Sequence, residues 1–204
     1  IGDQVWMAEN LKVTKYKDGN AISTGYTDSE WADLGITETG AYGVYRDDIA
    51  NADIYGYLYN WYAIEDSSLC MEGWHVPTDD EYKQLEMYLG MSEEDANSTG
   101  STTDRGTNEG SKLAGRSDLW ISSDTYFEKK LVNNTEFGTS GFNALPGGVR
   151  YWNGNGYNQM SYWTYYWTSN EYEDFDGTNA WLRYIDYRYS NIGRVSKQKE
   201  NGGY

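Results

Sequence analysis

The sequence has only one cysteine, Cys70, and one histidine, His75. A single cysteine permits no internal disulfide and no cysteine metal cluster, and a single histidine permits no multi-histidine metal site. No nucleophile motif lies near His75, and the chain carries no Gly-rich phosphate loop, Gly-x-Ser-x-Gly elbow or His-Glu-x-x-His motif. We therefore predict that the protein is not an enzyme and that His75 is a structural residue in or beside the core.

Basic residues are scarce: 16 Lys and Arg stand against 32 Asp and Glu, a formal net charge of −16. Because phosphate backbones need a basic surface, this balance argues against nucleic acid as a partner, and it disfavours anionic membranes. No apolar run approaches the roughly 18 residues of a bilayer span, so no direct membrane span is expected. Residues 1–102 carry −15 of the net charge, which predicts an acidic, solvating first half.

The chain begins at Ile1, without Met and without a signal peptide. We interpret this start as that of a processed product, whose precursor could carry an export signal. Proline (2 residues) and apolar residues (38%) are few, whereas 23 Gly, 9 Trp and 21 Tyr are present. Large aromatic rings offset the low apolar content, because they bury much area and keep a polar end. One compact domain over residues 1–204, with many turns, is the expected organisation.

The clearest local signal is a helix over residues 79–89. Thr78 and Glu81 have the spacing of a capping box, and Gly90 stands where a helix would end. Weaker patterns predict a short strand at 4–11, a short strand around Tyr42 and a short buried helix within 54–64. Residues 92–111 are polar and read as a loop, and residues 181–189 alternate as a strand. Asn201-Gly202 predicts a hairpin turn, which implies a further strand beyond Tyr204.

Several segments resemble the Fibrobacter succinogenes major paralogous domain, in the order in which that family carries them. They are Ile1–Leu11, Gly56–Trp61, Leu69–Tyr82, Gly141–Gly148, Tyr166–Ser169, Asn179–Trp181 and Lys199–Tyr204. The family is similar to C-type-lectin-like and formylglycine-generating-enzyme-like folds. The resemblance implies an α+β, C-type-lectin-like fold with twisted antiparallel sheets, two short helices and long loops. It also implies a secreted or lipid-anchored surface protein of Bacteroidetes and Fibrobacter relatives.

Cysteine content separates this chain from the enzymes of similar fold. Formylglycine-generating enzymes use two cysteines to bind copper, whereas this chain has only Cys70. The family usually continues past the Gly-Tyr position with a strand that bears a second cysteine. The resemblance therefore implies that Cys70 pairs with a cysteine beyond Tyr204.

One acidic stretch could hold a hard cation such as Ca²⁺. Asp174, Asp176 and Asn179 present alternating oxygens around Gly177. The final Glu of an EF-hand and the Glu-Pro-Asn and Trp-Asn-Asp signatures of calcium-dependent lectins are missing. The alternative is an acidic, solvated loop without metal, and no cofactor is required by the sequence.

Residues 151–189 hold 14 aromatic residues in 39 positions. Trp167, Trp181 and Ile185 match structural blocks of the family and are expected in the core. The other aromatics lie among Asn and Gly, as in binding loops, where rigid rings and adaptable amides recognise a ligand. The candidate ligand-binding residues are Tyr151, Trp152, Tyr157, Tyr162, Trp163, Tyr165, Tyr172 and Tyr184.

Two functions remain open on these observations. The favoured one is a surface-exposed or secreted binding or adhesion module that recognises a glycan or a surface protein through the aromatic loops. The other is a structural or tip subunit of a cell-surface assembly, in which the aromatic region packs on a partner subunit. Burial of all four of Trp152, Tyr157, Trp163 and Tyr165 would exclude the first function. The oligomeric state is left open.

Overall fold

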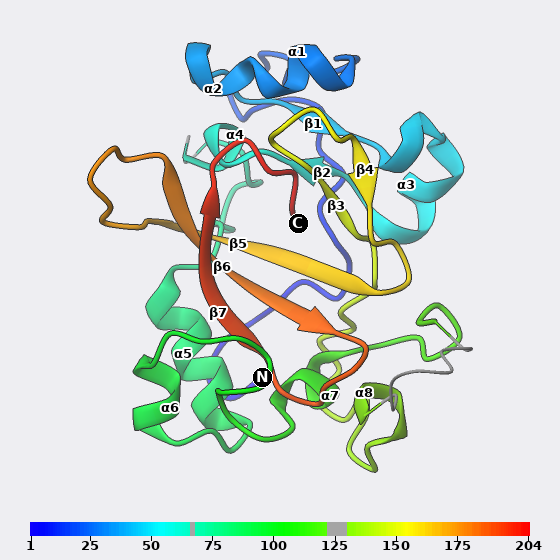
Figure 1. Ribbon diagram of the computed structural model, residues 1–204, viewed down its shortest axis with the longest axis vertical. Coiled ribbons are helices and arrows are strands. Elements are labelled where there is room, and N and C mark those ends of the chain that lie inside the picture. The colour runs from blue at the N-terminus through cyan, green and yellow to red at the C-terminus, as the bar shows by residue number, and fades with distance from the viewer. Residues whose placement is uncertain (66–67, 122–129) are drawn as a thin grey trace.

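The computed structural model describes residues 1–65, 68–121 and 130–204. The fold is mixed α and β, with three small antiparallel sheets in the described residues. The largest sheet, the central sheet, consists of β5 (Trp163–Glu171), β6 (Asn179–Asp186) and β7 (Gly193–Gln198) in the order β5-β6-β7. It lies between α1 and α2 at one end of the molecule and the helices α5 to α8 at the other (Figure 1).

The two faces of the central sheet have different neighbours. Side chains that are paired across strands share a face, so the register of β5 with β6 and of β6 with β7 assigns each residue to one side. The aromatic face carries Tyr165, Trp167, Leu182, Tyr184 and Lys197. The opposite face, here the helix face, carries Tyr166, Arg183, Ile185 and Arg194. Each face packs on its own hydrophobic cluster.

The helix α5 (Asp79–Tyr88) covers the helix face. It begins at the predicted capping box, in which Thr78 Oγ1 accepts from the Glu81 N–H and the Glu81 side chain accepts from the Thr78 N–H. It ends at Gly90, whose φ of 113° is open mainly to glycine. The predicted helix is therefore confirmed, with Leu89 as its C-terminal cap.

A buried ion network ties α5 to the sheet. Glu86, which is fully buried, pairs with Arg105 and with Arg183 Nε at 2.7 Å. Asp79 accepts from Arg183 at 2.8 Å and from Arg194 at 2.7 Å. Burial alone would raise the pKa of Asp79, but the hydrogen bonds and charges of Arg194 and Arg183 hold it well below the usual range. The network fixes the position of α5 on the helix face.

Short elements complete the fold. The N-terminal half contains α1 (Asp28–Ala32), α2 (Leu34–Thr37), β1 (Tyr42–Gly43), the 3-10 helix η1 (Tyr45–Asp47), α3 (Ile49–Tyr55), β2 (Leu58–Tyr59) and α4 (Trp61–Glu65). The C-terminal half adds α6 (Glu93–Asn97), α7 (Glu109–Leu113), α8 (Lys130–Asn133), β3 (Val149–Arg150) and β4 (Tyr157–Asn158). The described residues thus form eight α-helices, not the two expected. Side-chain caps start three of the additional short helices, α1, α3 and α6.

Four sequence predictions need correction. Residues 4–11 form no strand; the chain bends at residues 8–9, and Val5 is 82% exposed. The strand predicted at 181–189 ends at Asp186. The short buried helix predicted within 54–64 is present as α4, which starts at Trp61 after the end of α3 and the strand β2. Residues 92–111 contain α6 and the start of α7, because Ser92 caps α6 and three acids occupy its first turn.

The fourth correction concerns the turn at residues 201–202, which does not join two strands of one hairpin. The main chain instead turns away from β7 and bridges two other sheets. Gly202 pairs with Arg150 of β3, and Gly203 pairs with Tyr59 of β2. Tyr204 then bonds to β5, donating its N–H to the Tyr165 carbonyl and accepting from the Trp167 N–H. Tertiary pairing, rather than the local Asn-Gly signal, sets the conformation here.

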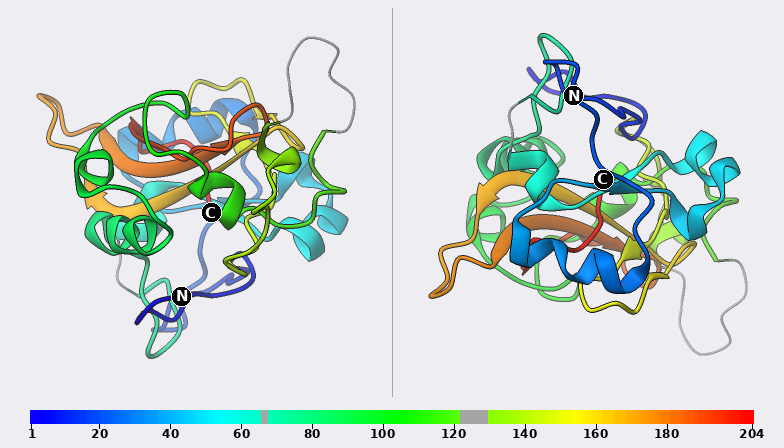
Figure 2. Two further views of the ribbon diagram at one scale, coloured as in Figure 1. Left: turned by 90° about the horizontal axis from the view of Figure 1, so that it is seen from below. Right: turned by 90° about the horizontal axis from the view of Figure 1, so that it is seen from above.

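Two further observations concern the outer surface of the molecule and the length of its helices. The segment that connects β5 to β6 projects from the body of the molecule in every view (Figures 1 and 2), with Phe175 fully exposed at its tip. Among the described residues, no helix is both long and apolar enough to cross a membrane.

Candidate functional site

A groove opens on the aromatic face of the central sheet, with a volume of about 440 Å³. We call it the aromatic groove. It is bounded by the sheet, by β3 and the segment after it, and by the turn at residues 201–203. Its lining comprises Val149, Tyr151, Trp152, Gln159, Trp163, Tyr165, Trp167, Asn179, Leu182, Ser196, Lys197, Gln198, Asn201, Gly202 and Gly203.

Three aromatic rings cluster on this face of the sheet, and two of them, Trp163 and Tyr165, line the groove with an angle of 47° between their planes. Trp163 lies 5.7 Å from Tyr184 with an interplanar angle of 30°, and Tyr165 lies 5.9 Å from Tyr184 at 23°. Strand pairing sets Tyr184 opposite Tyr165 on β5 and opposite Gly193 on β7. A Cβ atom on Gly193 would lie 2.1 Å from the Tyr184 ring, so the glycine leaves the space that the ring occupies. The register of the three strands therefore fixes the relative positions of these rings.

Uncharged polar groups accompany these rings. Gln159 accepts from the Tyr165 hydroxyl at 3.1 Å, and Asn201 donates to the Gln198 carbonyl at 2.8 Å. Burial raises the pKa of Tyr165 far above its ordinary value; it also raises the pKa of Tyr151, and there the hydrogen bond to Gln159 opposes the rise. Both phenols are therefore neutral at physiological pH. The groove offers rings, hydroxyls and amides, a combination suited to binding.

The structure brings together five of the eight aromatic residues predicted from the sequence. Tyr151, Trp152, Trp163 and Tyr165 line the groove, and Tyr184 stacks beside them. Trp152 is 44% exposed at the edge, Trp163 is half-buried and Tyr165 is only 6% exposed. Tyr157 is half-buried too, so the four rings named as the test of the binding function are not all buried.

The remaining three predicted aromatics lie elsewhere. The Tyr157 ring covers the Arg150 guanidinium at 4.7 Å, and its hydroxyl donates to Asp47. Tyr162 packs edge-on against Tyr187, and Tyr172 packs edge-on against Trp181. None of these three tyrosines is among the residues that line the groove. Sequence spacing could not separate the two sets, because only the fold decides which rings converge.

The predicted cation ligands are engaged with one another and with their own loop. Asn179 Nδ2 donates to Asp174, and Asp176 accepts from the N–H and hydroxyl of Thr178. Among the residues that the structure describes, no three His, Cys, Asp or Glu side chains are grouped as metal ligands. Calcium at Asp174, Asp176 and Asn179 stays a prediction.

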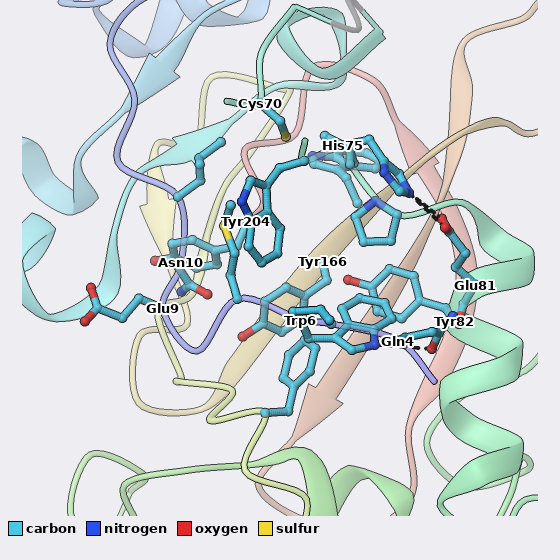
Figure 3. Close-up of a pocket in the computed structure, with 18 of the residues that line it drawn as sticks. Gln4, Trp6, Glu9, Asn10, Cys70, His75, Glu81, Tyr82, Tyr166 and Tyr204 are labelled. Carbon is cyan, nitrogen blue, oxygen red and sulfur yellow. Dashed lines mark hydrogen bonds and ion pairs between the residues drawn. The ribbon is translucent and has the colours of Figure 1, made fainter. Parts of the chain in front are cut away.

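A larger cavity, of about 600 Å³, lies between residues 3–11, residues 69–77 and the edge of β5. Figure 3 shows Trp6, Tyr82 and Tyr166 gathered at one side of it and Cys70 at another. No sequence pattern indicates this cavity, because its walls come from segments far apart in the chain. Its rings pack on one another, as Trp6 does on Tyr82 at 5.1 Å and on Phe142 at 5.5 Å.

The single histidine and cysteine both lie at this cavity. The His75 side chain is 67% exposed, so of the two predicted positions, in or beside the core, the first is wrong. Its Nε2 lies 2.8 Å from Glu81 of the capping box (Figure 3). Cys70 is buried, and burial raises the pKa of its thiol above the ordinary value, against the effect of Lys17. A thiol in this state is a poor nucleophile at neutral pH. Its pairing with a second cysteine stays a prediction.

Comparison with known proteins gives one match. The family model described as Fibrobacter succinogenes major domain matches residues 1–201. No curated protein and no solved structure shows a significant match. The match covers both the aromatic groove and the capped helix α5, so it does not depend on a single motif.

Proposed function

The chain belongs to the family of the Fibrobacter succinogenes major domain, and on that basis we propose that it is a binding module that recognises a glycan through the aromatic groove. The observation that carries the proposal is the cluster of Trp163, Tyr165 and Tyr184, of which Trp163 and Tyr165 line the groove beside a rim of amide side chains. We propose further that the module acts at the cell surface or outside the cell, either secreted or lipid-anchored.

Sugar rings suit this surface for a physical reason. Their C–H faces are flat and weakly polar, so they can cover an aromatic plane, while their hydroxyls form hydrogen bonds around the edge. The groove supplies the plane in Trp163 and exposed Trp152, and the edge in Gln159, Gln198 and Asn201. Its volume of about 440 Å³ is within the range of about 300–1,000 Å³ typical of small-molecule sites.

The same lining favours binding over hydrolysis. A glycosidase needs two carboxyl groups on either side of the scissile bond. The lining of the aromatic groove, as far as the structure describes the chain, includes no Asp, Glu, His or Cys. A sugar held against Trp163 would therefore meet donors and acceptors but no group that could exchange a proton near neutral pH.

A C-type-lectin-like arrangement is part of this proposal. Its support is the capped helix after Val76-Pro77, which packs on a small antiparallel sheet through the buried ion network. In folds of that kind the C-terminal region is the usual ligand face, which agrees with the position of the groove. An experimental structure that superposes on C-type lectins over the central sheet and α5 would support the arrangement.

The binding proposal is tested with the purified domain on a glycan array, followed by calorimetry on the sugars that bind. We expect Trp163→Ala to weaken binding at least ten-fold and Trp152→Ala several-fold, because each removes a ring from the groove. Phe175→Ala is the matched control, because it removes an exposed ring at the tip of the β5–β6 connection, outside the groove. Trp152→Ala is the safer variant, since its side chain is 44% exposed and its loss should leave folding intact.

Two results would contradict the proposal. One is binding that Trp152→Ala and Trp163→Ala leave at the level of Phe175→Ala. The other is no sugar bound at all, together with a stable partner in pull-down from the source cells, which favours the structural or tip subunit of a surface assembly. Circular dichroism of each variant separates lost binding from lost folding.

A further inference from the structure

The described lining of the aromatic groove has no acidic side chain, although the protein is strongly acidic. The chain has 32 Asp and Glu and a net charge of −16, yet none of the described Asp and Glu residues lines the groove. Among the described lining residues, Lys197 is the one that carries a charge. The local charge of the groove thus has the opposite sign to that of the whole protein.

Lys197 is positioned by the sheet rather than by a loose loop. It lies on β7 opposite Ala180 of β6, which places it on the aromatic face together with Leu182 and Tyr184. The residue is exposed, and among the described residues no carboxylate forms an ion pair with it. Its ammonium group is therefore available to a ligand in the groove.

Glu200 stands in sequence between the lining residues Gln198 and Asn201, and its carboxylate lies against Gly35 of α2. Three other acidic residues close to the groove in sequence are engaged with partners. Asp186, which pairs with Trp163 in the register of β5 and β6, forms a buried ion pair with Arg188. Glu171 accepts from Lys199 at 2.7 Å. Asp174 accepts from Asn179 Nδ2. None of these carboxylates competes for Lys197, and the two ion pairs leave little net charge beside the groove.

We propose that the groove selects a glycan that carries carboxylate groups, such as a uronic acid oligomer, and that Lys197 is the residue that determines this specificity. The inference depends on the proposed glycan-binding function and adds the charge of the ligand to it. The net charge of −16 repels anions at long range, but that field is screened over about 8 Å at physiological ionic strength. Inside that distance, Lys197 and the lack of acidic side chains in the described lining decide which sugar binds.

Specificity then follows from a single contact between charges. A neutral sugar covers the rings but leaves the ammonium group with water alone. A sugar carboxylate forms an ion pair with it at the edge of the groove. Exposed ion pairs are individually weak, so the expected discrimination is modest, about two- to five-fold in affinity.

The experiment compares two ligands that differ only in charge. Oligogalacturonate and the same oligomer with its carboxyl groups reduced to primary alcohols are titrated into the domain by calorimetry. We expect the wild type to bind the acidic oligomer about two- to five-fold more tightly than the reduced one. Lys197→Gln should remove that preference, and Lys197→Arg should keep it. Lys15→Gln is the control, since it removes the same charge from an exposed position outside the groove.

The outcomes distinguish this inference from the function on which it depends. Equal affinity for the two oligomers, with both weakened by Trp152→Ala, would overturn the acidic specificity and leave glycan binding in place. A preference for the acidic oligomer that Lys197→Gln does not change would overturn the role of Lys197. If neither oligomer binds and no sugar on the array does, the proposed function itself fails.

Discussion

At the scale of single residues, the most consequential side chains of this protein are charged ones inside it. Glu86 is fully buried and holds both Arg105 and Arg183, two guanidinium groups that have almost no contact with solvent. Taking such a group out of water is costly, and the charges and hydrogen bonds of its partners offset that cost. Removing one partner leaves the others buried and uncompensated.

The first prediction concerns this carboxylate. Glu86→Gln keeps the shape of the side chain but removes its charge, so we expect the free energy of unfolding to fall by about 3–5 kcal/mol. Urea unfolding followed by circular dichroism measures the change. Glu72→Gln is the control, because Glu72 is exposed and its loss should shift stability by less than about 0.5 kcal/mol. Equal unfolding midpoints for the two variants would show that the network does not stabilise the fold.

At the scale of elements, α5 is the helix that the chain specifies most fully by itself. Thr78, Glu81 and Gly90 define both of its ends locally, and its buried face presents Tyr82 and Leu85 to the core. By contrast, most of the other helices have only four or five residues. Helices so short are stable only through packing, since nucleation is costly and few hydrogen bonds follow it.

The second prediction tests the start of α5. Thr78→Ala removes the oxygen that accepts from the Glu81 N–H, so we expect a loss of about 1 kcal/mol in the free energy of unfolding. Thr78→Ser keeps that oxygen and should stay close to the wild type. Chemical denaturation of the three proteins under one condition gives the comparison. An alanine variant as stable as the serine variant would mean that the capping box contributes nothing measurable.

At the scale of the whole molecule, the distribution of charge sets the response to pH. Asp79 has a folded-state pKa below its ordinary value of about 3.9, because Arg194 and Arg183 outweigh the effect of burial. A carboxyl group of this kind stabilises the fold fully above its unfolded-state pKa. That contribution is lost as the pH falls through the folded-state pKa. Protonation of Asp79 therefore loosens α5 from the sheet in acid.

The third prediction isolates this group from the other acids. The difference in unfolding free energy between the wild type and Asp79→Asn should be large at pH 6 and should shrink as the pH falls below about 4. Asp80→Asn, one position along α5 and exposed, should show a small difference at every pH. Denaturation curves between pH 2.5 and pH 6 provide the measurement. A difference for Asp79→Asn that does not vary with pH would contradict the assigned shift.

The sequence by itself determined what depends on local chemistry and on family pattern. The ends of α5 could be read from Thr78, Glu81 and Gly90, because capping requires only neighbours in the chain. The family could be read from motifs in order, and the comparison over residues 1–201 confirms it. The strand β6 and the aromatic nature of the candidate site were likewise visible in the alternation and composition of residues 151–189.

Only the tertiary structure decided which of those residues meet. Tyr184 joins Trp163 because β6 pairs with β5 in one register, whereas Tyr172, in the same aromatic stretch, packs on Trp181 instead. The burial of Arg183 likewise depends on carboxylates more than 90 positions away in the chain. Composition and spacing describe each segment alone, and the contacts that make a groove or a buried ion network join segments that the sequence keeps far apart.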